Sequence, residues 1–430
     1  MTRVLIRGGR VVDPSQGLDE VRDLLLEEGH VAASSASLAD LADAPDIDIF
    51  DAFGLVVAPG FIDGRVHLGE PGFEERETLQ SGLRAAVAGG YTAVVALPDS
   101  DPVNDTRAVT EMLRSSAEAL GLARLYPMAA VSKGLRGEKL AELGELAEAG
   151  AVAACDAEHT LGTAFLRRAL LYAQHADLPI VHRARDCDLE DDGVMHEGEW
   201  STRLGLPGCP GMAEEMVIAR DLLLLADTGG RYHLSPVTTA GGVARVREGK
   251  ASGLALTCEV TPHHLVLSDQ EVLTSGFDPA TRVAPPLRSA DDVEALRAAL
   301  ADGTVDMIAS DHRPYHRDHK LDVQFSASPP GIVGLETTVG VCLDRLVGAG
   351  VIDVMRLVEL LSTGPARVFG LPGGSLEVGR PADVTVLDLD ATWRVDPEGF
   401  HSLGRATPFA GEELRGRASA VFVGGRRVDA

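Results

Sequence analysis

The sequence predicts an α/β protein: a closed (β/α)8 barrel, with a small β-sandwich domain formed by both ends of the chain. Strand-like and helix-like segments alternate over residues 58–370, and such alternation indicates a parallel sheet. This length favours a closed barrel over an open doubly wound sheet, and no glycine-rich nucleotide-binding turn follows any strand. Short β-type runs broken by Gly and Pro occupy both ends of the chain.

The alternation in the middle of the chain can be followed segment by segment. Residues 91–99 are rich in β-branched side chains and predict a strand, whereas residues 106–121 place apolar side chains at helical spacing. The same two patterns predict further strands at 61–67, 123–131, 151–156, 178–184, 231–237, 254–261 and 305–311. They predict further helices at 140–150, 165–176, 213–229 and 293–303.

The two ends of the chain are predicted to fold together. Residues 1–57 and 371–430 share the same texture of short strands, and neither segment has enough apolar surface to form a core alone. We therefore expect one small β domain made from both segments, with the barrel of residues 58–370 inserted between them.

Charge and cysteine content exclude several classes of protein. The 39 Lys and Arg residues against 65 Asp and Glu give a net charge of −26, which disfavours binding to nucleic acid or to an anionic membrane surface. No stretch approaches the roughly 20 apolar residues of a membrane span, and the first residues lack the apolar region of a signal peptide. The five cysteines are scattered and odd in number, so we expect reduced thiols in a cytoplasmic protein.

Polar side chains gather at the predicted ends of the barrel strands, where barrel enzymes carry their chemistry. His67, Asp99, Asp156, His182 and Asp311 each follow such a strand. A single His there is most often a structural residue, and a single Asp is most often a turn or helix-cap residue. Their occurrence on successive strands, however, is typical of a hydrolytic metal site.

Motifs along nearly the whole chain carry a family resemblance. They include VAPGFIDGRVHLGEPG, EVTPHHLVLSDQE, VAPPLRSADD, DMIASDHRP and PPGIVGLET. In this order they resemble the type I dihydroorotases of the amidohydrolase superfamily. The resemblance implies a TIM-type barrel, a zinc site, and the reversible cyclisation of carbamoyl aspartate to dihydroorotate in pyrimidine synthesis.

The metal positions of the family are only partly retained. The resemblance implies zinc ligands at a His-x-His pair, a bridging Asp and two later His, together with a catalytic Asp. His67, Asp156, His182 and Asp311 match these positions, but Arg65 replaces the first His of the pair and Pro236 replaces the last His. A guanidinium is always protonated and offers only donors, so it repels Zn²⁺.

The substrate positions of the family have changed as well. The Arg that binds the substrate carboxylate is replaced by Gly69, and an Asn that helps it is replaced by Asp99. A second Asn is replaced by Ala284 and a His by Tyr315, whereas the framework motifs survive. Loss concentrated at metal and substrate positions suggests a barrel retained for its shape and surface.

The sequence therefore predicts a pseudo-dihydroorotase that binds no cofactor. The resemblance implies a structural role beside aspartate transcarbamoylase, in a hetero-complex or as a homo-oligomer. In this interpretation Arg65 supplies the missing metal charge by pairing with Asp156 or Asp311.

Two alternatives stay open. One is an active dihydroorotase, or another cyclic amidohydrolase, with a mononuclear zinc site at His67, Asp156, His182 and Asp311. Hydantoinases and allantoinases use a carbamylated Lys where Asp156 stands. The other is a sensor in which Arg65 holds a ligand carboxylate. The order of the segment 315–330, which follows the last predicted strand, cannot be predicted.

Overall fold

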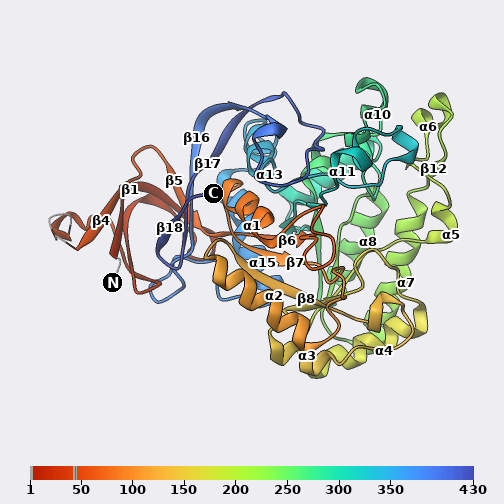
Figure 1. Ribbon diagram of the computed structural model, residues 1–430, viewed down its shortest axis with the longest axis horizontal. Coiled ribbons are helices and arrows are strands. Elements are labelled where there is room, and N and C mark those ends of the chain that lie inside the picture. The colour runs from red at the N-terminus through yellow and green to blue at the C-terminus, as the bar shows by residue number, and fades with distance from the viewer. Residues whose placement is uncertain (1–2, 42–43, 45) are drawn as a thin grey trace.

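Eight parallel strands form a barrel in the computed structural model, which describes residues 3–41, 44 and 46–430 (Figure 1). Each strand pairs with the next along the chain, and the first and last strands meet through a bridge between Val66 and His312. The strands are β6 (Phe61–Val66), β7 (Tyr91–Ala96), β8 (Arg124–Ala130), β9 (Ala153–Cys155), β10 (Ile180–His182), β13 (Tyr232–Leu234), β14 (Leu256–Val260) and β15 (Met307–Ile308).

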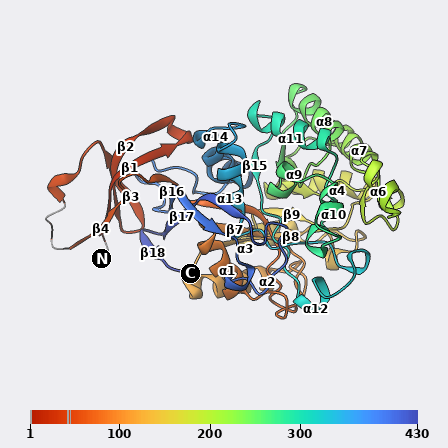
Figure 2. The same ribbon diagram turned by 90° about the horizontal axis from the view of Figure 1, so that it is seen from above.

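Helices cover the outside of the barrel (Figures 1 and 2). All six residues of β7 are buried, because the helices cover one face of the strand and the barrel interior covers the other. The covering helices are α1 (Leu79–Ala88), α2 (Arg107–Leu120), α3 (Leu143–Ala149), α4 (Thr163–Ala173), α7 (Met212–Thr228), α8 (Ala240–Ala251), α11 (Ala290–Ala301), α13 (Thr338–Cys342), α14 (Val354–Val358) and α15 (Gly364–Phe369). The predicted barrel is confirmed.

A second sheet combines both ends of the chain and lies to one side of the barrel (Figure 2). Its strands are β1 (Arg3–Asp13), β2 (Leu18–Glu27), β3 (His30–Ser35), β4 (Ile47–Asp51), β5 (Val56–Pro59), β16 (Val384–Arg394), β17 (Glu413–Val423) and β18 (Arg426–Val428).

This second sheet is one continuous, mostly antiparallel sheet that folds around its own core. The side chains of Leu24 and Leu26 from β2 pack in one cluster with Val384, Val386 and Phe422 from β16 and β17. The predicted sandwich is therefore made by a single sheet.

Short elements that the sequence did not predict cover the carboxyl ends of the barrel strands. They are α5 (Cys187–Glu190), β11 (Met195–His196), α6 (Glu199–Leu204), β12 (Gly208–Cys209), α9 (Pro262–Val266), α10 (Glu271–Thr274) and α12 (Arg317–Lys320). No helix among the described residues is long and apolar enough to cross a membrane.

The segment 315–330, left open above, folds over this end of the barrel around a buried lysine. The Lys320 Nζ donates to the carbonyl oxygens of Arg282 at 2.9 Å and Pro329 at 2.8 Å. Burial lowers the pKa of Lys320 to about 7, because desolvation disfavours the charged amine.

Asp13 links the two ends of the chain. Its buried carboxylate accepts hydrogen bonds from the backbone N–H of Ser15 at 2.9 Å and from the backbone N–H of Leu376 at 2.7 Å.

Asp13→Ala should destabilise the protein by about 1–3 kcal/mol, because buried donors lose their acceptor. Urea unfolding measures the effect. The control is Asp19→Ala, which removes a surface pair with Arg10 and should cost about 0–1 kcal/mol. Equal losses in the two variants would contradict the assignment.

Candidate functional site

Arg65 occupies the centre of the barrel at the end of β6. Its side chain is 1% exposed, and each of its three nitrogens bonds to a protein oxygen. Nε donates to Asp311 Oδ1 at 2.7 Å, Nη1 donates to Ser235 Oγ at 3.1 Å, and Nη2 donates to Glu158 Oε1 at 2.5 Å. The guanidinium is therefore held by three loops that follow different strands.

The pairing of Arg65 with Asp311 is electrostatically strong. Burial alone would raise the pKa of Asp311, but the charge and hydrogen bond of Arg65, together with the nearby His263 and His67, outweigh burial and lower that pKa to about 2. Burial also opposes the charge of Arg65, and the attraction of Asp311 raises the pKa of the guanidinium. Both groups are consequently ionised at neutral pH. Of the two alternative partners predicted for Arg65, Asp156 and Asp311, the structure pairs it with Asp311.

Glu158 is a central residue that the sequence did not reveal. Its carboxylate contacts the guanidinium groups of Arg65, Arg183 and Arg313, the last at 3.3 Å. It follows Asp156 by two residues, and Ala157 between them has a positive φ of 51°, so the loop turns sharply. Nothing in the local sequence pattern separates Glu158 from an ordinary solvated loop acid.

Asp156 and His182 form hydrogen bonds with residues other than Arg65. Asp156 Oδ1 accepts the backbone N–H of Ser132 at 2.8 Å, and its other oxygen accepts the Ser132 hydroxyl. His182 Nδ1 lies 2.8 Å from Asp221 Oδ2, and its Nε2 accepts the backbone N–H of Leu161 at 3.0 Å. This second bond fixes the proton on Nδ1. Both oxygens of Asp156 and both ring nitrogens of His182 thus have hydrogen-bond partners within the protein.

His67 keeps one free nitrogen. Its Nδ1 lies 2.6 Å from Asp99 Oδ2, whereas its Nε2 is buried without a hydrogen-bond partner and lies 3.9 Å from Glu158 Oε1. Burial lowers the pKa of His67, against the pull of Asp99. Of the two retained His positions, His67 alone keeps a ring nitrogen without a hydrogen-bond partner.

The last family ligand position has no replacement. The side chain of Pro236 has no atom that could bind a metal. The hydroxyl of the preceding Ser235 accepts a hydrogen bond from Arg65 and donates one to Glu259. His233 bonds to Glu259 at 3.2 Å and to Thr257 at 2.8 Å. It is therefore engaged elsewhere.

These residues do not fit a zinc ion. Among residues 3–41, 44 and 46–430, no group of three or more His, Cys, Asp or Glu side chains is arranged to hold a metal. Zinc sites need three or four converging neutral or anionic ligands, and here a fixed cation lies among the candidates. The set His67, Asp156, His182 and Asp311 does not converge as the mononuclear alternative requires.

The substrate positions are also closed. Gly69 has a φ of +66°, and a Cβ added there would lie 2.5 Å from the carbonyl oxygen of Glu77, so this backbone cannot carry the family's Arg. Gly69, Asp99 and Tyr315 line a small hollow of about 30 Å³. Ala284 lies apart from them, in a separate cavity. The sequence predicted these four as one group, and the structure brings three of them together.

The sensor hypothesis for Arg65 is not supported. It requires the guanidinium to face a ligand, but all three of its nitrogens bond within the protein.

Removal of the Arg65 charge should destabilise the protein. Arg65→Met leaves Asp311 buried without its salt-bridge partner, and breaking a buried ion pair costs about 3–5 kcal/mol. Urea unfolding measures the loss. The control Arg167→Met removes a surface pair with Asp227 and should cost about 0–1 kcal/mol. A variant at position 65 as stable as the unchanged protein would contradict this electrostatic role.

Comparisons with known proteins agree with the family resemblance found in the sequence. Residues 54–241 match a family model described as dihydro-orotase-like. A protein named dihydroorotase from Anaeromyxobacter dehalogenans is 51% identical over 427 residues, which cover 99% of this chain and 97% of that protein. Another of that name from Pelotomaculum thermopropionicum is 46% identical, with 99% and 98% covered.

Solved structures show the same architecture. The L-hydantoinase (dihydropyrimidinase) from Arthrobacter aurescens matches with a TM-score of 0.88 and 25% identity, over 100% of this chain and 96% of that one. The dihydropyrimidinase from Brevibacillus agri has a TM-score of 0.83 at 23% identity, over 99% and 95% of the two chains. The second likeness shows the fold alone.

Proposed function

The chain belongs to the dihydroorotase family, and from this premise we propose that it is a pseudo-dihydroorotase of pyrimidine biosynthesis. It keeps the barrel of an amidohydrolase but neither binds zinc nor interconverts carbamoyl aspartate and dihydroorotate. Its role is structural, as a partner that supports aspartate transcarbamoylase. We infer this partner from the resemblance to the family.

One observation carries the loss of activity: the buried Arg65 bonds to Asp311, the family's catalytic acid. A proton shuttle needs a pKa near the working pH and access to the reacting atom. Asp311 has a pKa of about 2 and gives one oxygen to Arg65. It is thus held as a carboxylate and is poorly suited to carry a proton.

The substrate side supports the same proposal. Binding of carbamoyl aspartate requires a cation for its carboxylates, and Gly69 offers none. The hollow beside Gly69 and Asp99 has a volume of about 30 Å³, much smaller than the roughly 300–1,000 Å³ of small-molecule sites.

An active enzyme remains the second candidate function, favoured by the 51% identity to a protein named dihydroorotase and by the free Nε2 of His67. Activity would require Arg65 to leave the barrel centre and His182 to release Leu161. Such a rearrangement breaks several buried bonds at once.

A turnover assay separates the two candidates. The purified chain with added zinc should give no conversion of dihydroorotate, under conditions in which an active dihydroorotase does. Arg65→His combined with Pro236→His should gain zinc binding, because it restores two imidazole ligands and removes the cation. The matched control, Arg65→Met with Pro236→Ala, removes the cation without adding ligands and should gain none. Turnover by the unchanged chain with stoichiometric zinc would overturn the proposal.

The partner is tested separately. Co-expression with the aspartate transcarbamoylase of the same genome should give a complex of fixed stoichiometry on size-exclusion chromatography, and Arg65→Lys, which keeps the charge, should retain it. Transcarbamoylase that elutes alone, with unchanged activity and stability, would contradict the structural role.

A further inference from the structure

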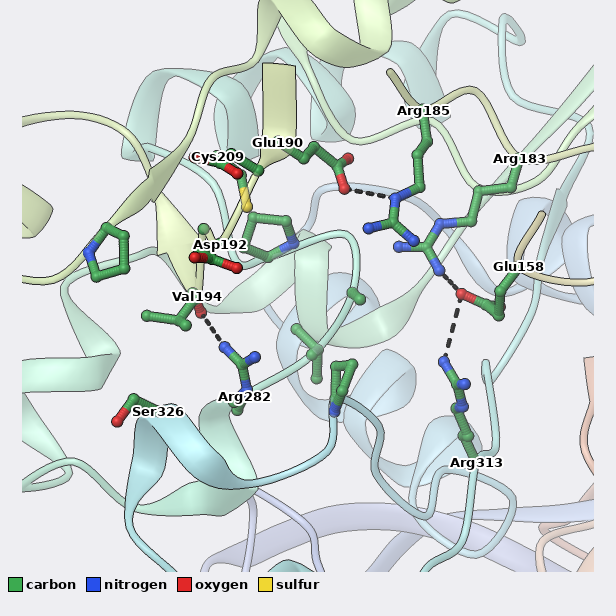
Figure 3. Close-up of a pocket in the computed structure, with 17 residues that line it drawn as sticks. Glu158, Arg183, Arg185, Glu190, Asp192, Val194, Cys209, Arg282, Arg313 and Ser326 are labelled. Carbon is green, nitrogen blue, oxygen red and sulfur yellow. Dashed lines mark hydrogen bonds and ion pairs between the residues drawn. The ribbon is translucent and has the colours of Figure 1, made fainter. Parts of the chain in front are cut away.

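A cavity of about 540 Å³ lies beside the Arg65 cluster at the mouth of the barrel (Figure 3). Four arginines line it: Arg183 and Arg185 after β10, Arg282 before α11, and Arg313 after β15. In Figure 3, Arg183, Arg313 and Glu158 lie on one side and Arg282 lies on another. Guanidinium groups brought together from three separate loops are typical of sites that recognise oxyanions.

Four acidic residues, Glu158, Glu190, Asp191 and Asp192, also line this cavity. Among the described residues, only Glu158 and Glu190 form ion pairs with its arginines, and Arg185 pairs with Glu190 at 2.5 Å. Arg282 donates to two carbonyl oxygens, those of Ser328 at 2.6 Å and Val194 at 3.0 Å. A carbonyl oxygen carries no net charge, so neither bond neutralises the guanidinium of Arg282.

On the opposite side of the cavity, Arg183 and Arg313 share one carboxylate. In the part of the chain that the structure describes, Glu158 is the one carboxylate with which they form ion pairs, and it also pairs with Arg65. Arg183 is 2% exposed, and its Nε is buried without a hydrogen-bond partner. Burial, together with the nearby charges of Arg65 and Arg185, lowers the pKa of Arg183 to about 9. A buried guanidinium with an unused donor beside a cavity indicates that an acceptor is missing.

We propose that this cavity binds the phosphate group of a small phosphorylated molecule, between Arg282 and the pair formed by Arg183 and Arg313. Arg183 and Arg313 converge on one point, marked by the carboxylate of Glu158. An anion bound next to that point therefore has to accept hydrogen bonds from both guanidinium groups with oxygens carried on a single atom. A phosphate monoester carries its charge and three acceptor oxygens on one atom, whereas a dicarboxylate separates its charges along a carbon chain. This site is independent of whether the chain is an enzyme.

Calorimetric titration of the full chain with inorganic phosphate tests the proposal, with malonate and acetate as the other probes. Phosphate should bind and should bind more weakly as salt rises, and the other two should not bind. Arg282→Gln and Arg313→Gln should each weaken phosphate binding about tenfold or more, because each loses a charge-assisted hydrogen bond. Glu158→Gln should strengthen binding, because it frees guanidinium charge.

The matched control is Arg345→Gln, which removes a guanidinium that pairs with Glu412 on the surface and should leave phosphate binding unchanged. Thermal melting identifies variants that have lost the fold, and the two cavity arginines provide independent readouts if one variant unfolds. Absence of phosphate binding, a preference for malonate, or equal weakening by Arg345→Gln would overturn the proposal.

Discussion

A single buried cation sets the chemistry of this barrel. Arg65 stands at the end of the first barrel strand, inside a low-dielectric interior where an unpaired charge is strongly unfavourable. Asp311 and Glu158 lie against it and compensate it. Arg65 thus pairs with Asp311, the position at which the family resemblance implies the catalytic Asp.

The surrounding polar groups are consistent with that substitution. Asp156 bonds to Ser132, His182 bonds to Asp221 and Leu161, and Asp99 bonds to His67. Each bond satisfies inside the protein a group that would otherwise face a metal or a substrate. The barrel keeps its shape because its interior remains closely packed, with the centre closed by hydrogen bonds and ion pairs.

The sequence predicted the barrel and the shared sheet because their signals are periodic: alternating strands and amphipathic helices are legible over long segments. It also predicted that Arg65 pairs with Asp156 or Asp311, because all three lie at strand ends that converge. It did not reveal Glu158, since a loop carries no periodicity and the turn at Ala157 decides where that carboxylate points. For the same reason the sequence could not decide between Asp156 and Asp311.

Diffraction at the zinc absorption edge, from crystals grown with zinc, tests most directly whether Arg65 stands in the place of a metal. The account predicts no anomalous density at the barrel centre and a guanidinium bonded to Asp311 and Glu158. An anomalous peak within bonding distance of His67 Nε2, with Arg65 turned away from Asp311, would contradict it.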